Sequence, residues 1–182
     1  MAEKVLLASD PLFQKRLTVR LLEQNDLEAA ARVIRDSFAT VAKEFNLTID
    51  NCPTNGAFTQ TKHLRMDLEK NNRLYGVYLE KEMIGFFELV YQKEAQVTLE
   101  KVAIISSERG NQYGKYILDK AREIAGNEHI KQIDIGIIKA NTRLREWYQK
   151  HGYQIVRSQN STHLPFEVLY MKLDLTNEVA NG

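Results

Sequence analysis

The chain contains few of the residues that crosslink small folds or bind metals. Its 182 residues include one cysteine, Cys52, and three prolines. A single cysteine forms no disulfide within the chain and supplies no thiolate cluster for zinc. The four histidines also lack the spacing of metal ligands. We therefore expect no metal site, and a lone thiol is typical of a reducing compartment.

Long apolar runs and a large net charge are also missing. No stretch approaches the ~20 apolar residues that span a bilayer. The apolar run at residues 5–8 is too short for a secretory signal. Lys and Arg number 25 and Asp and Glu 24, which gives a formal charge of +1. This balance argues against partners held by the overall electrostatic field, so we expect a cytoplasmic protein that binds neither nucleic acid nor membrane.

The chain shows no internal division. It has no repeat, no low-complexity tract and no linker rich in proline or glycine. Chains of this length commonly form one domain. We expect a single domain over residues 1–182, with a core from about 17 to 175 and a polar tail over 176–182.

Apolar periodicity predicts the element order β-α-α-β-β-β-α-β-α-β-β. Short turns between the early strands favour antiparallel pairing, whereas helical crossovers later in the chain permit a parallel pair. The expected fold class is therefore α/β, a mixed sheet with helices packed on it. The expected strands span 17–22, 74–79, 83–91, 96–105, 130–138, 153–157 and 166–175. The expected helices span 26–45, about 58–72, a stretch around 117–125, and 142–150. Asn25 or Asp26 is the expected N-cap of the first helix.

The stretch most informative about chemistry is a turn that contains Gly110 and Gly114 and leads from a strand into an amphipathic helix. Free N–H groups at a helix N-terminus attract an anion, and glycines let a phosphate approach the main chain. Arg109 adds a basic side chain to the same turn. The pattern predicts a phosphate or pyrophosphate cradle. The alternative is a tight turn that only begins a helix.

Two common nucleotide motifs do not fit this stretch. The P-loop has four residues between its glycines, followed by Lys and then Ser or Thr. Here three residues separate Gly110 from Gly114, and Tyr116 follows Lys115. The dinucleotide fingerprint Gly-x-Gly-x-x-Gly is absent. The spacing therefore disfavours a kinase-like, ATP-binding protein.

The turn resembles the acetyl-CoA-binding signature of the GNAT superfamily of N-acetyltransferases. That signature is a strand ending in Leu-x-Val, then a loop, then Arg/Gln-x-x-Gly-x-Gly/Ala at the start of a helix. Residues 102–104 correspond to the strand end and 109–114 to the loop, with Gln112 in place of the family's first glycine. Residues 141–153 resemble the family's Asn…Tyr…Gly-Phe segment, with Tyr148 seven residues after Asn141.

The resemblance covers about residues 17–175 and implies the GNAT fold, a mostly antiparallel sheet with one parallel pair and helices on both faces. It implies acetyl transfer from acetyl-CoA to a primary amine of a small molecule, an amino acid or a peptide. By the same resemblance Tyr148 would protonate the departing thiolate, and Glu100 would accept the amine proton, directly or through water. Glu88 is a weaker substitute for Glu100.

The resemblance also implies a cofactor site and an acceptor site. The acceptor site would include Phe45, from the loop after the first helix, and His163 and Phe166, from between the last two strands. Backbone N–H groups would bind the thioester and the pyrophosphate, and Asn141 the pantetheine arm. The implied cofactor-binding residues are Val102, Ala103, Ile104, Arg109, Gly110, Asn111, Gln112, Tyr113, Gly114, Lys115 and Asn141.

The catalytic candidates also have structural interpretations. Tyr148 could be a packing aromatic on an apolar helix face, and Glu100 an exposed strand residue. Cys52 is not expected to act as a nucleophile, because no histidine is near it in sequence. For the whole protein, the alternative is a non-catalytic acyl-CoA-binding sensor or regulatory domain on the same fold. Both a monomer and a homodimer fit the sequence.

Overall fold

The computed structural model describes residues 17–93 and 95–176. The N-terminal apolar run and the polar tail beyond Thr176 lie outside the described residues. The elements follow the order expected from the sequence. The helices are α2 (Leu27–Glu44), α3 (Thr61–Glu69), α4 (Tyr113–Asn127) and α5 (Thr142–Lys150), and the strands are β1 (Leu17–Leu21), β2 (Arg73–Leu79), β3 (Glu82–Tyr91), β4 (Gln96–Ile104), β5 (Gln132–Ile138), β6 (Gln154–Asn160) and β7 (Glu167–Asp174).

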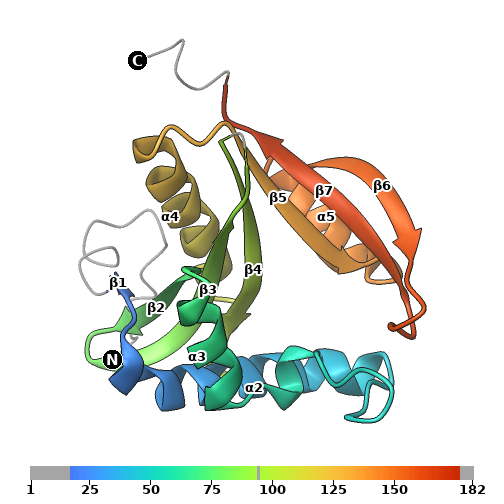
Figure 1. Ribbon diagram of the computed structural model, residues 1–182, viewed down its shortest axis with the longest axis horizontal. Helices are drawn as coiled ribbons and strands as arrows, with labels where there is room; N and C mark the ends of the chain where they lie inside the picture. Colours follow the sequence, from blue (N-terminus) through green and yellow to red (C-terminus); the bar gives the residue numbers. More distant parts are fainter. Residues whose placement is uncertain (1–16, 94, 177–182) are drawn as a thin grey trace, which may run out of the picture.

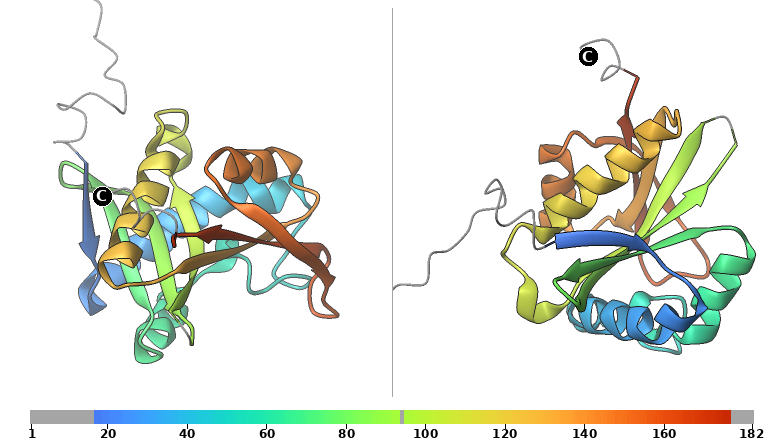
Figure 2. Two further views of the ribbon diagram at one scale, coloured as in Figure 1. Left: turned by 90° about the horizontal axis from the view of Figure 1, so that it is seen from above. Right: turned by 90° about the vertical axis from the view of Figure 1, so that its left-hand side faces the viewer.

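The strands form one seven-stranded sheet in the order β1-β2-β3-β4-β5-β7-β6 (Figure 1). Neighbouring strands are antiparallel except β4 and β5, which are parallel because α4 crosses over between them. Helices α4 and α5 cover one face of the sheet, and α2 and α3 cover part of the other (Figure 2). The expected fold class, including the parallel pair, is confirmed.

A core lies on each side of the sheet. On the α4 side, Ile117 and Ala121 are fully buried against strand residues such as Ile133. On the other side, Leu27 and Ile34 of α2 are fully buried. Burying one such side chain stabilises the fold by about 1.5–3 kcal/mol. The apolar stripes of the helices therefore determine which face of the sheet each helix covers.

The start of α2 differs from the expectation. Asp26, one of the two expected N-cap residues, is the N-cap of α2, but its side chain makes no capping hydrogen bond there. A short 3-10 turn (Gln24–Asp26) precedes α2, and Glu23 is the N-cap residue of that turn. The Asp26 carboxylate accepts a hydrogen bond from the Glu23 N–H at 2.9 Å. This reciprocal capping box begins the helical segment earlier than the apolar period alone indicates.

β4 and β5 form a fork at the centre of the sheet. Their ladder joins Gln96–Thr98 to Gln132–Asp134, and no pairing links the two strands beyond Thr98 in the described part of the chain. Figure 1 shows the strands diverging toward α2. A β-bulge in β4 lies at the divergence, because residues 101 and 102 together oppose one residue of β3. We call residues 99–104 and 135–138 the fork.

Candidate active site

The loop between β4 and α4 is held on α2. The Ser106 N–H donates a hydrogen bond to Asp36 Oδ2 at 2.6 Å. The Arg109 guanidinium donates to the Thr40 hydroxyl at 2.8 Å and to the Ser37 carbonyl at 2.5 Å. These contacts occupy two of the five N–H donors of the Arg109 guanidinium. Arg109 thus fixes the loop in front of α4.

The first turn of α4 has no side-chain cap. The N-cap residue is Gln112, and its side chain makes no capping hydrogen bond. Its backbone is left-handed, with φ 62°. This conformation explains why the family signature has glycine here, since a residue with a Cβ is strained by about 1–2 kcal/mol in this region. An uncapped helix N-terminus presents backbone N–H groups and the positive end of the helix dipole to an anion.

The two glycines of the loop do different things. Gly110 has φ +85°, and a Cβ built on it would meet no atom within 4 Å, so its backbone borders open space. A Cβ on Gly114 would lie 3.2 Å from Cζ2 of the Trp147 indole. Of the two, Gly110 therefore fits the expected approach of a phosphate, whereas Gly114 allows α5 to pack closely against α4.

A cavity of about 470 Å³ lies beside this turn, between α4 and α5. It contains most of the predicted cofactor residues and reaches β4 at Ile104, one arm of the fork. Sequence reasoning missed the α5 side of the cavity, which is lined by Trp147 and His151. These residues are one helical turn apart, and their ring centroids are 4.6 Å apart. The lining residues are Ile104, Glu108, Arg109, Gly110, Gln112, Tyr113, Gly114, Lys115, Trp147 and His151.

Val102, Ala103, Asn111 and Asn141 lie outside the lining of this cavity. Asn141 is the N-cap of α5, and its side-chain oxygen accepts a hydrogen bond from the Leu144 N–H at 3.1 Å. Its side-chain NH₂ is then the group suited to a ligand.

One backbone donor expected to face the thioester has a protein partner. The Ile104 N–H donates to Ser37 Oγ at 3.3 Å. Ser37 is buried on α2 and was missed from the sequence, because its role depends on a contact between residues 67 positions apart. The same residue binds Arg109 through its carbonyl. Ser37 therefore links α2 to both the strand end and the loop.

Tyr148 is a core residue with a buried phenol. It is 5% exposed and packs edge-on against Trp147 and Tyr153, with ring centroids 4.9 and 5.2 Å away. Burial raises the pKa of its phenol, which is therefore protonated at neutral pH. The hydroxyl makes no hydrogen bond to any described residue. The phenol proton is thus not committed to an acceptor within this part of the protein.

Glu100 and Glu88 have opposite environments. Glu100 follows Leu99, which is buried on the α4 side, so its side chain lies on the opposite face of β4. Much of the side chain is exposed, but partial desolvation by the surrounding protein raises the pKa of its carboxyl group, with Lys101 opposing the rise. Glu88 is 0% exposed and is bonded to Lys101 and to Asn72. Glu88 is therefore unsuited to replace Glu100 as the base, because both oxygens of its carboxylate already accept hydrogen bonds.

Two of the three predicted acceptor residues come together. Phe45, at the end of α2, and Phe166, before β7, belong to one apolar cluster with Ile138 at the end of β5. His163 is exposed, and its neighbour Leu164 joins the cluster instead. The members of this apolar cluster are Ala42, Phe45, Leu47, Cys52, Ala57, Ile138, Leu164 and Phe166. Cys52 is 1% exposed within it, in agreement with a packing role.

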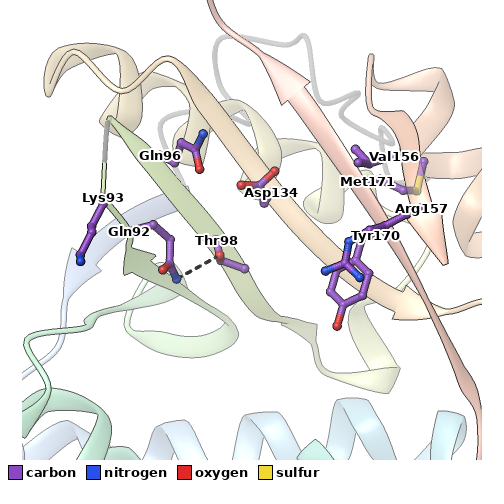
Figure 3. Close-up of a pocket in the computed structure, with 9 residues that line it drawn as sticks. All are labelled: Gln92, Lys93, Gln96, Thr98, Asp134, Val156, Arg157, Tyr170 and Met171. Atoms are coloured by element: carbon purple, nitrogen blue, oxygen red, sulfur yellow. Dashed lines mark hydrogen bonds between the residues drawn. The ribbon is translucent and has the colours of Figure 1, made fainter. Parts of the chain in front are cut away.

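A second hollow is a groove of about 560 Å³ lined partly by Thr98 of β4 (Figure 3). Asp134 of β5 lies at its floor between Thr98 of β4 and Tyr170 of β7. Thr98 and Glu100 are two residues apart on β4, so they share a face of the strand. The groove's lining is Gln92, Lys93, Gln96, Thr98, Asp134, Val156, Arg157, Tyr170 and Met171.

Within residues 17–93 and 95–176, no helix is long and apolar enough to cross a membrane. The same residues contain no group of three or more His, Cys, Asp or Glu side chains that could hold a metal ion.

Three solved structures with similar folds are named as acetyltransferases. A probable acetyltransferase from Staphylococcus epidermidis is 13% identical, with 88% of this chain and 99% of that chain covered and a TM-score of 0.70. The ribosomal-protein-S18-alanine N-acetyltransferase from Escherichia coli is 13% identical, with coverage of 87% and 94% and a TM-score of 0.70. PaiA N-acetyltransferase from Thermoplasma acidophilum, solved in complex with coenzyme A, is 17% identical, with coverage of 87% and 98% and a TM-score of 0.67.

The sequence comparisons are more specific than the fold. A search of curated proteins found no match. Residues 43–153 match the acetyltransferase (GNAT) family, and this segment is more than half of the chain and includes both predicted motifs. The chain therefore belongs to the acetyltransferase (GNAT) family.

Proposed function

We propose that this protein is an acetyl-CoA-dependent N-acetyltransferase that transfers the acetyl group directly to a primary amine. The observation that carries the proposal is the arrangement at the fork. The cavity beside the uncapped end of α4 reaches the strand edge at Ile104, and Glu100 lies on the same strand but on the other face of the sheet. A donor site and an acceptor site can thus meet at β4 from opposite sides.

The residues present fit acetyl-CoA. The uncapped N–H groups from Gly110 to Lys115 suit a pyrophosphate, and the open space at Gly110 gives it access to the main chain. The diverging edge of β4 at 102–104 and the side-chain NH₂ of Asn141 suit the amides of a pantetheine arm. When bound, the cofactor would supply an acetyl thioester, which is the activated form of the acetyl group.

Glu100 and Tyr148 would handle the two protons of the reaction. The Glu100 carboxylate would accept a proton from the substrate ammonium, directly or through water, and its raised pKa makes it a stronger base than an ordinary carboxylate. The Tyr148 hydroxyl would donate its proton to the departing thiolate, which belongs to a thiol whose ordinary pKa is about 8.5. The phenol is protonated at neutral pH, because its ordinary pKa is about 10 and burial raises it further.

The acceptor would bind on the Glu100 face. The apolar cluster around Phe45 and Phe166 includes Ile138 of the fork. The groove is lined by Thr98 and Asp134, which directly precede the fork on β4 and β5. Related folds include enzymes named for a ribosomal-protein alanine and, in a Vibrio cholerae–human chimera, for spermidine. Spermidine has primary amines, and an alanine can present one, so the proposed acceptor class is a primary amine of a small molecule, amino acid or peptide.

Calorimetric titration with acetyl-CoA, CoA, ATP and NAD tests the proposal. Gly114→Glu would force a charged side chain against Trp147 and into the cavity, and we expect acetyl-CoA binding to be lost. Gly126→Glu is the matched control, because a Cβ at Gly126 on the same helix meets no atom within 4 Å. The control should bind like the wild type.

Three outcomes separate the alternatives. Acetyl-CoA binding together with thiol release in the presence of a primary amine supports the enzyme. Acetyl-CoA binding without thiol release across a panel of amines and peptides would favour the acyl-CoA-binding sensor. Equal binding of ATP, or no binding of acetyl-CoA, would contradict both.

A further inference from the structure

A buried ion cluster lies directly beside the fork. The Lys101 ammonium donates to Asp67 Oδ2 on α3 at 3.0 Å and forms an ion pair with Glu88 on β3. The Asn72 side-chain NH₂ donates to the other oxygen of Glu88 at 2.6 Å. The side chains of Lys101, Asp67 and Glu88 are 23%, 15% and 0% exposed. One cation thus joins three secondary-structure elements in a largely water-excluded place.

Lys101 is also the residue that forms the bulge. Its φ is 49°, in the left-handed region, and it stands where β4 has two residues opposite one of β3. Glycine is the usual residue at the left-handed position of such a bulge. A lysine there is strained, and its ammonium holds it by contacts that glycine lacks. The side chain of Lys101 therefore anchors the bulge to β3 and α3.

The anchored bulge lies between two parts of the proposed site. Glu100 precedes it on the acceptor face, and the strand edge at 102–104 follows it toward the cofactor cavity. We propose that Lys101 is a positioning residue for acetyl transfer, which holds the bulge so that Glu100 and the 102–104 edge face the reaction together. This inference rests on the proposed function.

The same cluster surrounds the Glu100 carboxylate with charge. The groups that act on it are Lys101 on its own strand, Glu88 on β3, and Asp67 and Lys70 on α3. Lys101 and Lys70 lower the pKa of Glu100, whereas Glu88 and Asp67 raise it. Removing the charge of Lys101 and removing the charge of Glu88 must therefore move the Glu100 pKa in opposite directions. The opposite signs follow from the opposite charges of the two side chains, so the two variants together separate an electrostatic effect on Glu100 from a general loss of stability.

The test compares Lys101→Met, Lys101→Arg and Glu88→Gln by the pH dependence of kcat/KM, with acetyl-CoA and the best amine found. The acidic limb of this profile reports the base that must be deprotonated in the free enzyme. We expect the limb to move to higher pH in Lys101→Met and to lower pH in Glu88→Gln. Lys101→Met should lower kcat at least about tenfold because the reacting groups are misplaced, with a smaller change in KM for acetyl-CoA.

Two controls make these shifts interpretable. Lys101→Arg keeps the positive charge and should retain kcat within about threefold of the wild type. Lys120→Met removes a lysine from the Lys120–Glu123 pair on the surface of α4 and should leave the profile unchanged. Far-ultraviolet circular dichroism of each variant shows whether it is folded, and Glu88→Gln provides the shift if Lys101→Met does not fold.

Three results would overturn the inference. Unchanged pH profiles in folded Lys101→Met and Glu88→Gln would do so, as would shifts in the same direction. A wild type that binds acetyl-CoA but acetylates no amine would remove the proposed function and this inference with it. A working wild type with an unaffected Lys101→Met would remove the inference alone.

Discussion

Replacing Gln112 by glycine is expected to stabilise the protein. Gln112 has φ 62° and ψ 13°, a left-handed conformation that costs a residue with a Cβ about 1–2 kcal/mol. Glycine removes this strain, but it also increases the conformational entropy of the unfolded chain, which lowers stability by about 0.4–1 kcal/mol. The net gain is about 0.5–1 kcal/mol, which corresponds to a rise in Tm of roughly 1–4 °C for a chain of this length.

Gly110→Ala is the counterpart of this substitution and should change stability in the opposite direction. Gly110 has φ +85° and open space around its Cβ position, so the penalty in alanine comes from the backbone alone. The loss should again be about 0.5–1 kcal/mol. Gln112→Ala keeps the Cβ and should gain little, which makes it the control for loss of the glutamine side chain.

Thermal unfolding of the ligand-free protein measures all three variants. The expected order of Tm is Gln112→Gly highest, then Gln112→Ala close to the wild type, then Gly110→Ala. A Gln112→Gly variant no more stable than Gln112→Ala would refute the assignment of left-handed strain to this position. The reasoning also fails if Gly110→Ala unfolds at the wild-type temperature.

The remaining predictions concern the two proton-transfer groups. Tyr148→Phe should lower kcat about 10²-fold, which steady-state thiol release measures. The Tm should stay nearly unchanged in a melting curve, because the hydroxyl makes no hydrogen bond to a described residue. Wild-type kcat/KM should fall with decreasing pH at a pKa above the ordinary Glu value of about 4.3, because partial desolvation raises the pKa of Glu100. Glu100→Gln should remove that acidic limb, and its persistence in the variant would assign the proton to another group or to water.

The sequence predicted the fold because its apolar periods are consistent along the chain. Alternation at Ile133, Ile135 and Ile137 gave a buried strand, and the helical stripe of α2 gave its buried face. The parallel pair followed from the crossover through α4. The proposed cofactor loop could be identified in the sequence by its glycines and by its resemblance to the GNAT signature, because these residues are contiguous in the chain.

The features that sequence reasoning missed depend on contacts between distant residues. The pairing of Lys101 with Glu88 and Asp67 joins three elements, and no glycine in β4 signals the bulge at Lys101. The contact between Trp147 and Gly114 depends on how closely α5 approaches α4. The groove over Asp134 is assembled from four strands and the turn between β3 and β4. Such contacts leave no periodic trace in the sequence.

The central claim is that this chain acetylates a primary amine at the fork. Its most direct test is incubation with acetyl-CoA and a mixture of small amines, amino acids and peptides, with acetylated products identified by mass spectrometry. We predict an acetylated amine with the wild type and at least about tenfold less of the same product with Tyr148→Phe. Acetyl-CoA binding without any acetylated amine, or equal product from wild type and Tyr148→Phe, would contradict the account of the site given above.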